Sequence, residues 1–215
     1  MTRTTLGGIA GLALVLCTLG FSVAAAEQTA VALNAGETDL LNRVSLYLNQ
    51  MATLRAHFAQ VSPDGSLGEG QLTMQRPGRI RFEYLQPSPL LVVADGTFVV
   101  VQDKAHDTTD RYPLSATPLD IILEEHVDLA KDLLITHVEH RGGVIRLTAR
   151  DRAEPGKGEV TLVLDEQPMA LRQWVVVDAQ GMATSISLDD LHPNIQVDSR
   201  QFIFNDSAPK PRRER

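Results

Sequence analysis

Six histidines are the first residues that could support acid–base or metal chemistry, and they are scattered along the chain. They are His57, His106, His126, His137, His140 and His192. His137 and His140 lie three residues apart on an expected strand, so they point to opposite faces and do not suit one shared metal ion. The chain contains neither His-Glu-x-x-His nor Gly-x-Ser-x-Gly. We therefore predict no metal site and no cofactor.

Two pairs of carboxylates and one glycine-rich segment are the other candidates for chemistry. Glu124-Glu125 and Asp189-Asp190 are paired only along the sequence, and a solvated surface is their expected role. The segment 65–70 leads into a strand rather than into a helix N-terminus, so it forms no phosphate cradle. Its glycines are expected at a hairpin and a bulge. We therefore predict that the protein is not an enzyme and has no catalytic residues.

Arg76 has the most unusual setting of any polar residue. The segment 70–89 predicts two strands joined by a tight turn at Pro77-Gly78, with Gly78 taking a positive φ. Strand alternation then places Arg76 in phase with apolar side chains, while the other face carries Arg79, Arg81 and Glu83. A cation on an apolar face is costly unless it is hydrogen-bonded. Either Arg76 reaches water at the strand end, or it stands at the mouth of an apolar cavity and binds a polar group across it.

The first 26 residues predict a cleaved secretory signal peptide. Arg3 precedes an apolar run from Leu6 to Val23, and Ala24-Ala25-Ala26 forms a cleavage site. The alternative is an uncleaved membrane anchor, since about 18 apolar residues could just span a bilayer. Small residues at the end of the run favour cleavage. Cys17 follows Leu16, which makes it a poor lipid-attachment site, and it is expected to leave with the signal.

Cleavage would remove 26 of the 215 residues and leave 189. The net charge would change from −7 to −8, because Arg3 is the only charged residue lost. This length fits a single domain, residues 27–206, without cysteine. The acidity argues against nucleic acid as a partner. The one basic cluster lies in residues 207–215, which are expected to form a disordered tail.

Two helices are expected. Apolar residues recur at helical spacing from Asp39 to Leu54, with Thr38 or Asp39 as the cap. The second helix is short: Thr117 is expected at the N-cap, Pro118 at the first helical position and Asp120 in the first turn. Its apolar stripe consists of Leu119, Ile122 and Leu123. So short a helix is marginal alone and must dock on an apolar surface.

The rest of the chain predicts strands separated by turn signals, hence an antiparallel sheet that forms a barrel or a sandwich. The later strands are expected at 133–140, 144–150, 159–164, 170–177 and 182–188. Two runs, Leu90–Ala94 and Phe98–Val101, are apolar on both faces. Such strands need cover on the outer face as well, or a deep cavity on the inner one. Phe202-Ile203-Phe204 is expected to close the fold.

Ordered motifs over nearly all of the chain after the signal resemble the periplasmic outer-membrane lipoprotein carrier family. They begin with Phe58-x-Gln60, Gly70-x-Leu72 and Arg76-Pro77-Gly78-Arg79-x-Arg81-Phe82-x-Tyr84. They continue with Asp95-Gly96, Thr117-Pro118-Leu119, Ile122-Leu123, Asp178-x-x-Gly181 and Phe202-x-Phe204. One departure is the basic tail soon after Phe204, where some members carry an additional closing strand.

The resemblance implies an incompletely closed antiparallel barrel of about ten or eleven strands, mainly β with α, covered by a lid of short helices. It implies a monomeric periplasmic carrier of acylated lipoproteins. The partners would be an inner-membrane lipoprotein-releasing ABC transporter and an outer-membrane lipoprotein acceptor. Arg76 would bond the lid, to which Leu119, Ile122 and Leu123 belong. The acyl-chain cavity would be lined by Phe58, Leu72, Met74, Ile80, Phe82, Tyr84 and Trp174.

Three other interpretations remain open at this point. A generic periplasmic lipid-binding protein fits the pattern as well as a carrier does. A sensor of the same fold could regulate an envelope stress protease, but it would need a further domain, for which 189 residues leave no room. A β-sandwich without a cavity would use the same apolar residues as core.

Overall fold

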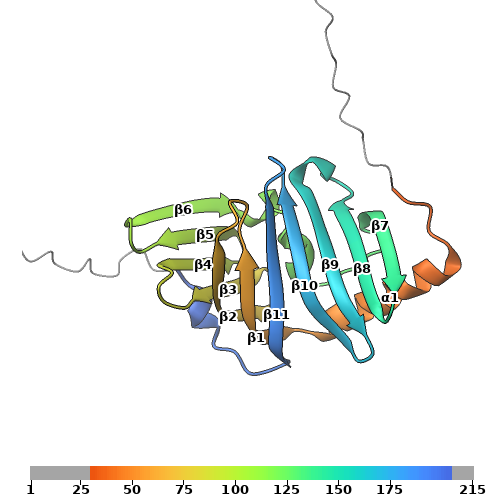
Figure 1. The fold of residues 1–215 in the computed structure, drawn as a ribbon, viewed down its shortest axis with the longest axis horizontal. Coiled ribbons are helices and arrows are strands. Elements are labelled where there is room, and N and C mark those ends of the chain that lie inside the picture. Colours follow the sequence, from red (N-terminus) through yellow and green to blue (C-terminus); the bar gives the residue numbers. More distant parts are fainter. Residues whose placement is uncertain (1–29, 205–215) are drawn as a thin grey trace, which may run out of the picture.

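A computed structural model describes residues 30–204 and shows one antiparallel sheet of 11 strands (Figure 1). The strand order is β6-β5-β4-β3-β2-β1-β11-β10-β9-β8-β7, so pairing of β1 with β11 joins the two halves of the chain. The strands β6 and β7, which follow one another in sequence, lie at opposite edges, and the sheet stays open. This confirms the predicted open barrel with short helices. The expected signal peptide with Cys17 and the expected tail, 207–215, lie outside the described residues.

Residues 30–204 form one long helix, eleven strands and several short helical segments. In chain order they are α1 (Ala35–Gln50), β1 (Thr53–Val61), β2 (Leu67–Gln75), β3 (Arg79–Tyr84), β4 (Leu90–Asp95), β5 (Phe98–Asp103), β6 (Thr108–Pro113), η1 (Leu114–Ala116), α2 (Asp120–Leu123), β7 (Leu133–Arg141), β8 (Val144–Asp151), η2 (Pro155–Lys157), β9 (Gly158–Glu166), β10 (Met169–Asp178), β11 (Ala183–Pro193) and η3 (Ser199–Phe202). In Figure 1 the sheet faces the viewer and the helices α1 and α2 lie behind it.

The helix α1 begins four residues earlier than predicted because a capping box starts it. The side chain of Asn34 accepts a bond from the Glu37 amide at 3.0 Å, and the amide of Asn34 donates to the Glu37 carboxylate at 2.8 Å. The predicted caps, Thr38 and Asp39, were therefore wrong. The helix ends at Gln50, and Leu54 belongs to β1 rather than to the helix.

The cap predicted for the short helix α2 was also wrong. The hydroxyl of Thr117 donates to the carbonyl of Leu114 at 2.8 Å and so closes η1. The helix α2 starts only at Asp120, and no side chain caps it. Thr117 is used by the preceding turn, so Pro118 lies before the helix rather than at its first position, whereas Asp120 lies in the first turn as predicted.

Glycines in β2 make room for aromatic rings rather than forming a bulge. Pairing of β1 with β2 runs without a register shift, so the predicted bulge was wrong, whereas Gly65 does lie in the hairpin turn with φ 81°. A Cβ on Gly70 would collide with the backbone carbonyl of Glu83 and lie 2.9 Å from the Phe58 ring. A Cβ on Gly68 would lie 2.9 Å from the Tyr84 ring. These glycines allow two aromatic rings to lie flush against the strand.

The outer face of β4 is covered, as the two-sided apolar run predicted. Leu91 and Val93 are buried against Phe202 of η3, with Val197 beside them. The chain therefore returns after β11 across the outside of β3 and β4. On the neighbouring strand Phe98 stays 37% exposed, and the guanidinium of Arg111 lies 5.9 Å from its ring centre. None of the helices in residues 30–204 has the length and apolar character that crossing a membrane requires.

Candidate functional site: the apolar interior and its lid

All seven side chains predicted to line a cavity meet on the inner face of the sheet. Leu72 pairs with Phe82 and Met74 pairs with Ile80, which aligns β2 and β3 in the expected register. Six of the seven are at most 5% exposed, and Tyr84 is half-buried. Trp174 comes from β10, on the other side of the β1–β11 junction. The sequence thus identified residues from both halves of the chain that share one surface.

Aromatic rings fill much of this interior. The ring centres of Phe58 and Phe82 are 5.2 Å apart and those of Phe58 and Tyr84 are 5.0 Å apart, both edge to face. Phe82 and Trp174 follow at 6.4 Å. Such pairs contribute about 0.5–1.5 kcal/mol each beyond the burial of their area. In this conformation the predicted lining residues pack on one another, within one continuous core.

One polar contact lies among these rings. The hydroxyl of Tyr84 donates to the side-chain carbonyl of Gln60 at 2.6 Å. Burial raises the pKa of Tyr84 to about 12, although the hydrogen bond to Gln60 acts in the opposite direction. The phenol is therefore neutral at physiological pH and adds no charge to the interior.

The helix α1 covers part of the inner face and holds the lid, which we define as residues 114–129. Its buried side chains include Leu41, Val44 and Leu48. Asn49 donates to the carbonyl of Val127 and accepts from the amide of Val127, both at 2.9 Å. The amide of Leu129 donates to the Ser45 hydroxyl at 3.1 Å. Sequence reasoning missed Ser45 and Asn49, because their partners lie about 80 residues away and no local pattern marks them.

Arg76 connects α1, β2 and the lid. Its Nη1 donates to the carbonyl of Leu48 at 2.9 Å, and its Nη2 donates to the carbonyl of Ile122 at 2.6 Å. Next to it, the amide of Gly78 donates to the carbonyl of Leu123 at 2.8 Å. Of the two interpretations left open by the sequence, the structure excludes the one in which Arg76 reaches water at the strand end, since Arg76 bonds two backbone carbonyls; its place at the mouth of an apolar cavity stays a prediction. The planar guanidinium suits such bonds because it offers donors in fixed directions.

The guanidinium of Arg76 is largely removed from water. Burial lowers its pKa to about 10, and the nearby carboxylate of Glu124 opposes that shift. The group therefore remains a cation at neutral pH. Its Nε is buried and has no hydrogen-bond partner among the described residues. The two carbonyls therefore compensate only part of the cost of removing this charge from water.

The lid buries more apolar surface than the sequence predicted. Ile122 and Leu123 are buried as expected, and Leu119 is half-buried. Ile121 is buried too, although a long helix would have turned it outward. Because α2 has a single turn, its neighbours enclose it from several sides. Val127 and Leu129 add two more buried side chains from the loop that follows.

A hollow of about 360 Å³ lies beside the lid rather than among the predicted lining residues. The turns of the β2–β3 and β4–β5 hairpins form one wall, and η1 and α2 form the other. Burial raises the pKa of Asp120 and of Glu124, and repulsion from Asp120 adds to the shift of Glu124. The lining residues are Pro77, Gly78, Gly96, Thr97, Leu114, Ser115, Asp120, Leu123 and Glu124.

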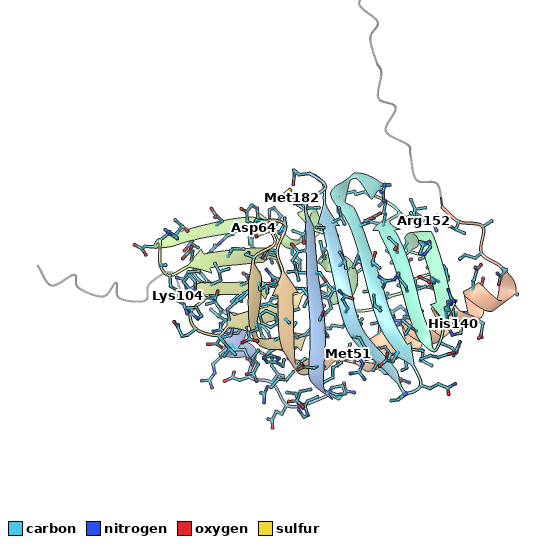
Figure 2. The ribbon with its side chains drawn as sticks, viewed as in Figure 1. Met51, Asp64, Lys104, His140, Arg152 and Met182 are labelled. Atoms are coloured by element: carbon cyan, nitrogen blue, oxygen red, sulfur yellow. The ribbon has the colours of Figure 1, made fainter. Side chains whose placement is uncertain are left out.

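The remaining chemical candidates lie apart from this site. His137 and His140 are on opposite faces of β7, as predicted, and Nε2 of His140 bonds the Glu166 carboxylate at 2.8 Å near α1 (Figure 2). Glu125, Asp189 and Asp190 are exposed, whereas Glu124, the remaining carboxylate of the two sequence pairs, lines the hollow beside the lid. Within residues 30–204 no group of three or more His, Cys, Asp or Glu side chains could hold a metal ion.

The curated relatives of this chain include outer-membrane lipoprotein carrier proteins. An outer-membrane lipoprotein carrier protein of Halorhodospira halophila is 27% identical over 183 residues, which are 81% of this chain and 85% of that protein. The carrier protein of Pseudomonas aeruginosa is 27% identical over 192 residues, covering 85% and 91% of the two chains. Among solved structures, a LolA superfamily protein from Nitrosomonas europaea has a TM-score of 0.39 at 10% identity, covering 77% of this chain and 95% of that one.

The family match extends over most of the described chain. The profile of the family described as outer membrane lipoprotein carrier protein LolA matches residues 49–205, from the end of α1 to just past η3. This range contains every strand of residues 30–204, the lid and Arg76, while Leu48, one of the two residues that Arg76 bonds, lies just before it. The chain therefore belongs to the LolA family of outer-membrane lipoprotein carrier proteins.

Proposed function

We propose that the protein is a periplasmic carrier that holds the acyl chains of lipoproteins against its inner face. As a monomer with one carrier domain, residues 27–206, it would accept cargo from an inner-membrane lipoprotein-releasing ABC transporter. It would deliver the cargo to an acceptor at the outer membrane. Family membership and the apolar inner face support this proposal. The observation that carries it is the Arg76 bridge, which fastens a lid over that face through two backbone carbonyls.

Cargo binding requires α1 and the lid to move away from the sheet. The proposed acyl-chain surface of Phe58, Phe82 and Trp174 is covered by other side chains in this conformation. Each methylene that leaves water contributes about 0.8 kcal/mol. One acyl chain therefore binds strongly enough to displace several lid contacts, each of which is worth about 1 kcal/mol. The closed conformation then corresponds to the empty carrier.

Reclosure of the lid gives a physical reason for release without ATP. When Arg76 and Gly78 recover their lid carbonyls, the recovered bonds offset part of the free energy of acyl binding. The affinity for cargo is lowered by the same amount. Such a bridge lets the carrier hand cargo to an acceptor whose binding surface has no lid to close.

Replacing Arg76 by leucine tests the proposal. Leucine cannot bond the carbonyls of Leu48 and Ile122, so the open form gains population and keeps its cargo. We expect Arg76→Leu to load lipoprotein normally and to transfer it to acceptor-containing membranes about tenfold more slowly, because 1.4 kcal/mol is a factor of ten. Arg79→Leu is the matched control, since Arg79 lies next to the same turn and bonds Gln75 instead. Transfer by Arg76→Leu at the wild-type rate would contradict the proposal.

The bound molecule itself separates a carrier from a general lipid-binding protein. Native mass spectrometry of protein recovered from the periplasm should show acylated lipoprotein on the wild type and more of it on Arg76→Leu. Free phospholipid as the sole bound species would support the lipid-binding interpretation instead.

A further inference from the structure

The short helix α2 is tied to both halves of the sheet. On one side, Arg76 and Gly78 of the β2–β3 turn bond the carbonyls of Ile122 and Leu123. On the other side, Nζ of Lys157 lies 3.4 Å from the Asp120 carboxylate. Lys157 ends η2, in the connection between β8 and β9. The helix therefore spans between two parts of the sheet that are far apart in the strand order.

The ammonium of Lys157 is held by two carboxylates from its own part of the chain. It lies 2.9 Å from the Asp151 carboxylate and 3.2 Å from that of Glu154, and its side chain is 13% exposed. Burial opposes the charge on Lys157, but the bonds to Asp151 and Glu154 outweigh this effect and raise its pKa. A charge held by two partners of its own segment is well placed to position a third group on another segment.

Carboxylates surround this lysine. Besides its three partners, Glu124 and Asp132 lie nearby. Burial raises the pKa of Glu124 most, and repulsion from Asp120, Asp132 and Asp151 adds to the shift. Lys157 is the group that acts against that shift. One oxygen of Asp120, Oδ1, is buried and has no hydrogen-bond partner among the described residues. Without the lysine, Asp120 would be a largely buried anion next to Asp151.

We propose that Lys157 is a positioning residue for the lid, holding the Asp120 end of α2 against the β8–β9 connection by neutralising Asp120. The inference rests on the proposed function for its meaning, since it names a second fastening of the same lid. The two fastenings differ: Arg76 bonds neutral carbonyls, whereas Lys157 compensates charge. Removing Lys157 releases one end of α2 and leaves the Asn49 contact with Val127 intact.

Hydrogen exchange of single amides in the empty protein tests this directly. The reporters are the amides of Ile122 and Gly78, which bond within the lid and to it, and that of Val127, which bonds Asn49. In Lys157→Met we expect Ile122 and Gly78 to exchange about tenfold faster through local opening, with Val127 unchanged. Adding Asp120→Asn should restore slow exchange, because the buried charge that needed compensation is gone.

The double variant Lys157→Met/Asp120→Asn distinguishes a lysine that positions the lid from one that only stabilises η2. If Lys157 acted only through Asp151 and Glu154, Asp120→Asn would leave the fast exchange of Lys157→Met unchanged, and the proposal would fail. It would fail equally if Lys157→Met exchanged like the wild type. Lys104→Met is the control. Lys104 is exposed, and it lies on the opposite side of the molecule from Arg152, which belongs to the β8–β9 connection (Figure 2).

Folding and cargo are separated from this result by two further measurements. Amides of β9 and β10 should keep their protection in Lys157→Met, which shows that the sheet is intact. The exchange experiment contains no lipoprotein, so it can succeed even if the transfer assay with Arg76→Leu fails. Failure of one proposal is therefore distinguishable from failure of the other.

Discussion

The apolar interior under the sheet and the edge of the lid are stabilised by different interactions. We call the contacts of Arg76, Asn49 and Lys157 with the lid the seam. In the interior, Phe58, Phe82 and Trp174 bury large apolar surfaces and contact one another through ring edges. Along the seam, single polar bonds join Arg76, Asn49 and Lys157 to groups on the lid. The first kind of interaction is strong and tolerates movement; the second is weak and requires one geometry.

The difference suggests a division of roles. Apolar contacts supply most of the free energy of folding, and in the proposed function an acyl chain would replace some of them, because it is equally apolar. Polar seam contacts contribute little in total, but they exist only when the lid is closed. A substitution in the interior should therefore change the stability of the whole protein, whereas a substitution in the seam should mainly change how often the lid opens.

The largest stability effect is expected for Phe58→Ala. Phe58 is fully buried between Phe82 and Tyr84, so truncation leaves a cavity and removes two ring contacts. We expect a loss of about 4 kcal/mol in the free energy of unfolding, measured by urea denaturation. Phe98→Ala, on the outer face and partly exposed, should lose about 1 kcal/mol. Equal losses for the two variants would remove the basis for treating the interior as the main source of stability.

A smaller effect is expected for Asn49→Ala in the seam. The variant loses two hydrogen bonds to the backbone of Val127, and we expect a cost of about 1–2 kcal/mol in stability. The amides of Val127 and Leu129 should exchange faster than those of the sheet. Asn42→Ala, on the exposed face of the same helix, corrects for the gain in helix propensity. If Asn49→Ala leaves exchange in the lid as unchanged as the control Asn42→Ala does, Asn49 does not hold the lid.

The smallest effect concerns pH and Asp120. Burial raises the pKa of Asp120 above its ordinary value of 3.8, so the folded protein binds this proton more tightly than the unfolded chain does. The stabilisation by protonation is complete below that value and is lost as pH rises through the folded pKa. Asp120→Asn resembles the protonated form. It should therefore exceed the wild type in stability at pH 7 by less than about 1 kcal/mol, and this difference should shrink towards pH 4.

Denaturation of both proteins at the two pH values checks this prediction. Asp120→Asn also removes the repulsion by which Asp120 adds to the raised pKa of Glu124, and this effect has the same sign, because it lowers the cost of the Glu124 charge at pH 7. A lower stability of Asp120→Asn than of the wild type at pH 7 would contradict the prediction, because it would mean that Lys157 stabilises the Asp120 carboxylate by more than burial costs it.

Much of the inner face was predictable from local sequence. Alternation along 72–84 placed Leu72, Met74, Ile80 and Phe82 on one face, and each of them is buried there. The helix boundaries were less predictable: Asn34 and Glu37 formed a capping box, and Thr117 closed a turn instead of opening a helix. In both cases a polar side chain had more than one possible backbone partner nearby, and the sequence does not rank them.

The sequence by itself determined the alternating faces, the turn glycines and the unusual phase of Arg76, because these depend on the period of a strand and on neighbouring residues. Only the tertiary structure decided that Arg76 bonds Leu48 and Ile122, that Asn49 binds Val127, and that Lys157 meets Asp120. These partners lie between 28 and 78 residues apart in the chain. Long-range pairs form when the sheet curves and brings its two halves beneath one lid, and no local pattern of residue types encodes that approach.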